Sequence, residues 1–227
     1  MNPKNLRPLT AECLGTALFV FLGAGSVVMN TPNGLGTIGI ALVHGVAMAI
    51  IVSMTMNISG GHMNPAVTAA LWLARKVDNR TAGLYVVAQL IGAVLGALLI
   101  NAVLPHAAAR ATSIGTPMVA TSVTFTQAVL IEATLTFFLV SAVFGTAVSS
   151  EAPKIGGFGI GLAIFVDILI GGSLTGAAMN PARAFGPALV AWDWHGQAIY
   201  WIGPLLGGLA AAAVWKWVLL PRDPTNI

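Results

Sequence analysis

The fold of this chain is decided by two short stretches of sequence: Ser59-Gly60-Gly61-His62-Met63-Asn64-Pro65-Ala66 and Leu174-Thr175-Gly176-Ala177-Ala178-Met179-Asn180-Pro181-Ala182. In each, small residues lead into Asn-Pro-Ala, which opens a short apolar run (64–74 and 180–191). A helix of about eleven residues is about 16 Å long, which is half the thickness of a bilayer. Proline suits the first helical position because it lacks an amide hydrogen, and the asparagine before it is a good N-cap. Both runs are therefore predicted to be half-length helices.

The composition is that of an integral membrane protein. Only 7% of the 227 residues are charged, and the mean hydropathy is +0.88. Soluble domains carry about 25% charged residues, so a soluble domain is nearly excluded. A net charge of +3, with no basic run longer than Arg75-Lys76, excludes a nucleic-acid binder. Cys13 is the only cysteine, which rules out a disulfide framework or a cysteine-based metal site.

Six further segments are apolar over the length of about 20 residues that a membrane-spanning helix needs. They run over 9–29, 36–58, 81–104, 125–148, 156–174 and 197–219. The first is too long for a secretory signal peptide, and comparable segments follow it. The half-length helices fall in the connections after the second and fifth segments. The sequence thus predicts an all-α membrane protein with six transmembrane helices and two re-entrant half-helices.

The two halves of the chain resemble each other. Besides the Asn-Pro-Ala stretches, the segment 11–16 matches 131–136, with a glutamate at the second position of each. Each half holds three spans, and because three is odd, the second copy enters the membrane upside down. Inverted repeats of this kind place their functional site near the midplane, where the broken helices meet. We expect a single domain over 1–227, with repeats at about 1–110 and 120–227.

The cations predict the orientation. One side of the membrane receives Lys4, Arg7, Arg75, Lys76, Arg80, Lys154 and Arg222. The other side has Arg110, and Arg183 lies inside the second half-helix. The positive-inside rule then places both termini in the cytoplasm. The short ends outside the spans make a bacterial cytoplasmic membrane the expected location.

Two facing half-helices define a site with particular chemistry. Their positive dipole ends meet at the midplane, and each asparagine (Asn64, Asn180) can cap its helix through oxygen while its amide group stays free to donate. The preceding segments, 60–62 and 176–178, are predicted to run extended with their carbonyls lining the lumen. Such donors and acceptors suit a neutral hydrogen-bonding solute and repel cations. One Asn-Pro-Ala alone would indicate no more than a helix cap; two copies, 116 residues apart, favour a pore.

Across nearly its whole length the chain resembles the aquaporin (major intrinsic protein) family. The matching stretches are Ala11-Glu12, Ser59 to Thr68, Ala88-Gln89-Leu90-Ile91-Gly92, Glu132, and Met179 to Pro187. The resemblance implies six tilted helices, two half-helices, and a homotetramer with one pore in each subunit. It implies that the transported molecules are water and small neutral solutes, with no cofactor and no metal.

The resemblance also implies a selectivity filter of four residues, which read His44, Ile168, Ala177 and Arg183 here. The commonest water-specific pattern is similar to Phe, His, a small residue or Cys, then Arg. This chain departs from it at the first two positions and looks like the tonoplast intrinsic proteins of plants. Replacing an imidazole by Ile168 removes a donor and makes one wall apolar, so we expect a somewhat wider constriction.

Water should therefore pass, together with ammonia, hydrogen peroxide or urea. Glycerol is a weaker alternative, because glycerol channels typically carry Asp directly after the filter arginine, and Ala184 stands there. They also lack the aromatic pair that Tyr200-Trp201 matches. A channel for glycerol or another polyol, and more distantly an ion-coupled transporter, remain the alternatives. An enzyme is not expected, since no nucleophile–base pair or metal-ligand cluster is apparent.

The remaining polar residues of the spans carry individual predictions. Glu12 and Glu132 occupy equivalent repeat positions, and we expect them to accept hydrogen bonds from the half-helix loops. His62 is expected to line the cytoplasmic vestibule. Asp167 precedes a filter residue on an apolar span, and the expectation is either a pairing with Arg110 or Arg183, or exposure to extracellular water. His106 or Arg110 could add a fifth filter contact.

Overall fold

The structure is a computed structural model that describes residues 3–30, 34–153 and 155–221. Lys154 and Arg222, which entered the orientation prediction, lie outside these residues, and so does the side chain of Lys4. Within the described residues, six helices are long and apolar enough to cross a membrane. They are α1 (Pro3–Val28), α2 (Gly36–Thr55), α4 (Asn79–Val103), α6 (Phe125–Val143), α7 (Phe158–Thr175) and α9 (Gln197–Val214). A π-helical turn prolongs α6 over Phe144–Val148 and α9 over Trp215–Leu219.

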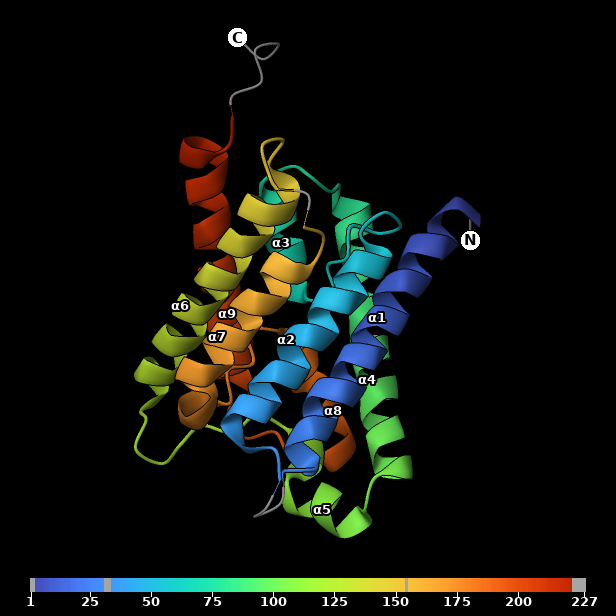
Figure 1. The fold of residues 1–227 in the computed structure, drawn as a ribbon, viewed down its shortest axis with the longest axis vertical. Coiled ribbons are helices and arrows are strands. Elements are labelled where there is room, and N and C mark those ends of the chain that lie inside the picture. The colour runs from blue at the N-terminus through green and yellow to red at the C-terminus, as the bar shows by residue number, and fades with distance from the viewer. Residues whose placement is uncertain (1–2, 31–33, 154, 222–227) are drawn as a thin grey trace.

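Two half-length helices lie among the six spans. They are α3 (Pro65–Leu73) and α8 (Pro181–Ala191), and each begins at the proline of its Asn-Pro-Ala. In Figure 1, α3 occupies the upper half of the bundle and α8 the lower half. The all-α fold with six spans and two re-entrant half-helices is confirmed.

The packing follows the repeat. Helix α1 packs on α4 as α6 packs on α9, and α2 packs on its repeat equivalent α7. Small residues allow these close approaches. A Cβ at Gly92 would overlap the carbonyl oxygen of Cys13, and a Cβ at Gly207 would overlap that of Ala133. Each repeat thus holds its first and last spans together by backbone contact.

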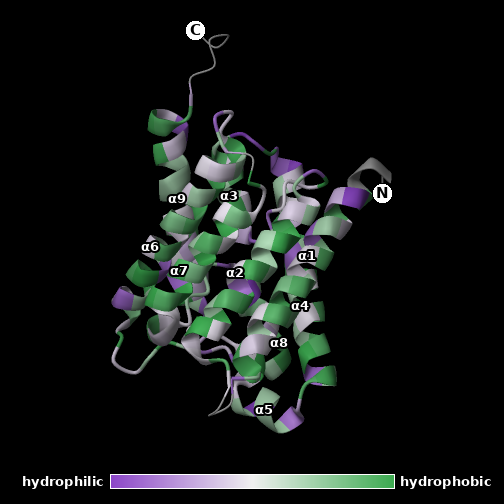
Figure 2. Ribbon diagram, viewed as in Figure 1, coloured by the Kyte–Doolittle hydropathy of each residue, from purple (hydrophilic) through white to green (hydrophobic). Residues whose placement is uncertain are grey.

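The outer surface of the bundle is apolar. Many exposed side chains on the spans are large hydrophobic ones, such as Leu14, Leu42, Ile91, Leu130 and Ile170. Figure 2 shows hydrophobic residues along the helices and hydrophilic ones gathered in the connections at the two ends. Lipid can cover such a surface without loss, because the backbone polar groups are satisfied inside the helices.

One connection holds elements that the sequence pattern did not predict. Between α4 and α6 the chain forms the short helix α5 (His106–Ala111) and a 3-10 turn over Ser113–Gly115. In Figure 1, α5 lies at the end opposite to the start of α1. The turn contacts both α1 and α8, so this connection covers the end of the bundle where α8 lies.

Candidate pore

Three adjoining cavities lie along the bundle. The central one is lined by residues from four spans and from both Asn-Pro-Ala loops, and its volume is only ≈ 20 Å³. It shares His44 and Ile168 with a vestibule of ≈ 400 Å³ on the side of the α4–α6 connection. It shares His62 and Ile160 with a vestibule of ≈ 460 Å³ at the other end. Since one water needs about 10–15 Å³ measured in this way, the central cavity has room for about one water at a time.

The two asparagines meet in the middle of this path. Asn64 Oδ1 accepts from the amide of Ala66, and Asn180 Oδ1 accepts from the amides of Ala182 and Arg183, so both cap their helices as predicted. Their amide groups are not wholly free, however. Asn64 Nδ2 donates to Met179 O at 2.8 Å, and Asn180 Nδ2 donates to Met63 O at 2.9 Å. Each amide therefore has one N–H fixed to the opposite loop and one N–H left for the central cavity.

Glu12 supports the first loop from outside the lumen. Its side chain is fully buried and accepts from the amides of His62 and Met63, at 3.0 and 2.8 Å, and from the hydroxyl of Ser59 at 2.6 Å. Gln89 Nε2 adds a fourth bond at 2.7 Å. A buried carboxylate needs such donors, and these fix the loop that precedes Asn64.

Glu132 does the same for the second loop. It is fully buried and accepts from the amides of Ala178 and Met179, at 2.9 and 2.7 Å, and from the hydroxyl of Thr175 at 2.7 Å. Two tyrosines complete the symmetry: the hydroxyl of Tyr85 donates to Ser59 O, and that of Tyr200 donates to Thr175 O. Both glutamates thus accept hydrogen bonds from the half-helix loops. The sequence alone predicts no such role for Gln89 or the tyrosines, although Tyr85 and Tyr200 are 115 residues apart, close to the spacing of the two repeats.

The backbone of the two loops differs from the extended run that was predicted. Three residues in each loop have a left-handed φ: Gly60, Gly61 and Met63 in the first, and Gly176, Ala177 and Met179 in the second. The reason is that successive amides turn outward to reach the buried glutamate. Because a trans peptide directs its carbonyl opposite to its amide, the carbonyls of residues 61, 62, 177 and 178 face away from the glutamates.

The four residues of the expected filter lie where the central cavity meets the adjoining vestibule. His44 and Ile168 line both the central cavity and the vestibule on the side of the α4–α6 connection, here called the outer vestibule. Ala177 lines the central cavity, and Arg183 lines the outer vestibule. All four side chains are at most 4% exposed. His44 Nδ1 lies 2.9 Å from Ile40 O, which can only accept, so in the neutral ring Nε2 is an acceptor.

Arg183 contacts the α4–α6 connection. Its Nη1 donates to the carbonyl oxygen of Gly115 at 2.9 Å. The fifth contact at this place therefore comes from Gly115. His106 and Arg110 are exposed on α5, and neither lines the vestibule, so the expectation that one of them joins the filter is wrong.

Asp167 does not behave as expected either. Its side chain is 2% exposed, so it does not face extracellular water. No hydrogen bond or ion pair joins it to Arg110 or Arg183, and its Oδ2 is buried without a hydrogen-bond partner in the described part of the chain. Helix α7 turns this residue away from the lumen into protein, since successive helical residues are 100° apart and Ile168 lines the cavity.

The fold and this path define a membrane protein with a narrow pore, in which two asparagine side chains lie at the meeting point of two half-helices. Residues 1–215 match the family described as Major intrinsic protein, and the chain belongs to that family. It is 40% identical to "Probable aquaporin TIP3-2" of Arabidopsis thaliana over 97% of this chain and 86% of that protein. It is 42% identical to "Aquaporin-8" of Rattus norvegicus over 90% of this chain and 78% of that protein.

The fold is also similar to a solved structure, that of the aquaglyceroporin from Plasmodium falciparum. The TM-score is 0.83, the sequence identity is 24%, and the match covers 95% of this chain and 97% of the other. At this identity the likeness concerns the fold alone. The relatives named here come from a plant, a rodent and a protozoan, so they give no support to the expected bacterial cytoplasmic membrane, while an integral multi-pass membrane protein is supported.

Proposed function

We propose that this chain is a passive water channel that also conducts small neutral solutes such as ammonia, hydrogen peroxide or urea, and excludes protons and other ions. The observation that carries the proposal is the pair of asparagine amides at the narrowest part of the lumen. Each keeps one N–H for the solute, so a water there accepts from the protein and its own hydrogens point outward along the file. This orientation hinders proton transfer between adjacent waters, and the charge of the buried Arg183 adds a second barrier to protons.

The constriction supports the range of solutes. Ile168 and Ala177 bring apolar side chains to the opening, and His44 and Arg183 bring polar ones. The buried Arg183 repels cations, and a neutral solute can donate to His44 or accept from Arg183. No carboxylate lines the central cavity among the described residues, which argues against an ion-coupled transporter. Membership of the Major intrinsic protein family also favours a channel over an enzyme.

The direct test is the permeability of proteoliposomes to water, ammonia, urea and glycerol, measured by stopped-flow light scattering. We expect rapid water flux, measurable ammonia and urea flux, and little glycerol flux. Slow water flux together with rapid glycerol flux would favour a polyol channel and would contradict the proposal.

We infer further that the protein is a homotetramer with both termini in the cytoplasm and one pore per subunit, in a single domain over 1–227. The exposed cations Arg7, Arg75, Lys76 and Arg80 lie at the end of the bundle that holds the vestibule lined by His62 and Ile160, which supports this orientation. The membrane of origin stays a prediction.

A His44→Ala variant tests the assignment of the constriction. Removing the imidazole enlarges the opening between the central cavity and the outer vestibule, so urea permeability should rise several-fold relative to water permeability. The matched control is His106→Ala, which removes an exposed imidazole outside the pore. If urea permeability stays unchanged in His44→Ala, the filter has been placed on the wrong residues.

Mercury provides a second test. Many members of the family carry a reactive cysteine at the position of Ala177, and here the lone cysteine is Cys13, half-buried on α1 and outside the three pore cavities. Water flux should therefore resist mercuric ions, and an Ala177→Cys variant should become sensitive. Strong, thiol-reversible inhibition of a Cys13→Ala variant would contradict this assignment.

A further inference from the structure

The turn that contacts Arg183 has an unusual backbone. Ser113, Ile114 and Gly115 are three consecutive residues with left-handed φ values of 47°, 58° and 74°. L-residues other than glycine pay about 1 kcal/mol or more in this region, so such a turn persists only where its surroundings hold it.

Part of the support comes from packing. The side chain of Ile114 is 5% exposed, and Gly115 lies so close to α1 that a Cβ would overlap the carbonyl oxygen of Ala24. These contacts limit how far the turn can move toward the bundle. The Gly115 carbonyl that Arg183 requires is also oriented from within the turn, because the amide of Thr116 on the same peptide donates to Ser113 O at 3.0 Å.

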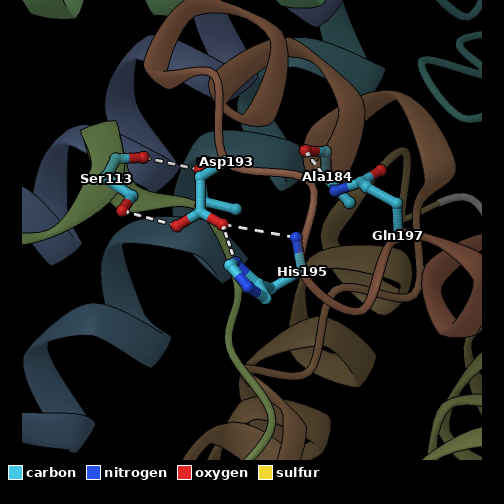
Figure 3. Close-up of polar contacts among 6 residues, drawn as sticks. Ser113, Ala184, Asp193, His195 and Gln197 are labelled. Carbon is cyan, nitrogen blue, oxygen red and sulfur yellow. Dashed lines mark hydrogen bonds and ion pairs between the residues drawn. The ribbon is translucent and has the colours of Figure 1, made fainter.

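Polar support from outside the turn comes from Asp193, two residues after α8. Asp193 Oδ2 accepts from the hydroxyl of Ser113 at 2.7 Å, and its Oδ1 lies 2.7 Å from His195 Nδ1 (Figure 3). The hydrogen bond from Ser113, followed by that from His195, holds the pKa of Asp193 below its usual value, so the group is a carboxylate at neutral pH. Figure 3 also shows Gln197 of α9, which donates to Ala184 O.

The turn is thus tied to α8 at two places. Arg183 in the first turn of α8 donates to Gly115, and Asp193 just beyond its last turn accepts from Ser113. Helix α8 is a rigid element of eleven residues. The contact of Ser113 with Asp193, just after the C-terminus of α8, therefore also helps to fix the Gly115 carbonyl that Arg183 contacts near the N-terminus of α8.

We propose that Asp193 is a positioning residue for solute selection: through Ser113 it sets the place of the Gly115 carbonyl and thereby of Arg183 in the constriction. The proposal rests on the proposed function of the pore. Asp193 and Ser113 do not line the central cavity, so neither touches a solute there. Releasing the turn lets the guanidinium leave the constriction and admits larger solutes.

The test compares the ratio of urea to water permeability in proteoliposomes of Asp193→Ala, Ser113→Ala and the double variant. Since a hydrogen bond to a carboxylate shifts an equilibrium by about tenfold or more, we expect the ratio to rise at least about threefold in each. The double variant should show no larger rise than either single one, because both remove the same contact. Asp193→Asn keeps an acceptor for Ser113 and should restore most of the selectivity.

If Asp193 acts through Arg183, its effect must disappear when Arg183 is replaced. In an Arg183→Val background, Asp193→Ala should leave the ratio unchanged, whereas general damage to the fold would change it again. Glu151→Ala is the matched control, because it removes an exposed loop carboxylate at the opposite end of the molecule. An unchanged ratio in Asp193→Ala, or an equal rise in both backgrounds, overturns the proposal.

Amide hydrogen exchange tests the turn without any flux. The amides of Gly115 and Thr116 donate within the turn, and their exchange should become faster in Asp193→Ala and Ser113→Ala, and remain slow in Glu151→Ala. Unchanged exchange in both variants overturns the proposal even if the wild-type protein proves not to conduct water. Rapid exchange together with an inactive wild-type protein would instead place the error in the proposed function.

Discussion

Arg183→Val should convert the pore into one that passes urea many times faster than the wild type and that begins to conduct protons. The guanidinium is buried and lies at the boundary between the outer vestibule and the central cavity. A second cation 4 Å away is repelled by about 4 kcal/mol at an effective dielectric constant of 20, and valine removes this barrier. Valine is also smaller, so the constriction widens.

Both effects can be measured on the same vesicles, with light scattering for urea and an internal pH-sensitive dye for protons. Arg110→Ala is the matched control, because it removes an exposed arginine of α5 on the same side of the molecule. If Arg183→Val still excludes urea and protons, the selectivity lies elsewhere in the lumen.

Glu132→Ala should abolish the folded protein. The side chain is fully buried and accepts three hydrogen bonds, from Thr175, Ala178 and Met179. Leaving three buried donors without a partner costs about 1–3 kcal/mol each. The sum is comparable with the whole stability of a typical domain, about 5–15 kcal/mol.

The measurement is the yield of monodisperse protein after detergent extraction, followed by thermal unfolding. Glu132→Gln keeps one acceptor oxygen and should lie between the wild type and Glu132→Ala, while Glu151→Ala should match the wild type. If Glu132→Ala unfolds at the same temperature as Glu151→Ala, the buried carboxylate does not support the loop in the way described.

Much of the fold could be predicted because its signals are local or repeated. Six apolar segments of membrane-spanning length and two Asn-Pro-Ala starts are visible in the sequence. The helix bounds lie within three residues of the predicted ones, except that α1 begins at Pro3, six residues before the predicted start. Glu12 and Glu132 were recognisable because the repeat places a carboxylate at the same position of two otherwise apolar spans. A buried charge in such a place needs donors, and the small-residue loops were the nearest source.

The rest depends on distances that only the folded chain sets. Gln89 bonds to Glu12 across 77 residues of sequence, and Gly115 bonds to Arg183 through its backbone, which any residue possesses. Asp167 was misread because its neighbour Ile168 suggested a place beside the pore. A helix rotates adjacent residues by 100°, and this rotation takes the carboxyl into the protein.

The crossed bonds of the two asparagines also bear on how the protein is made. Asn64 is synthesised 115 residues before its acceptor Met179, so the ribosome must have passed the second half-helix loop before the first can reach its final hydrogen bonds. Until then the first half-helix is inserted without its partner and one amide group lacks an acceptor. Maturation of the first repeat in the membrane is thus a late event, which the arrival of the last third of the chain brings about.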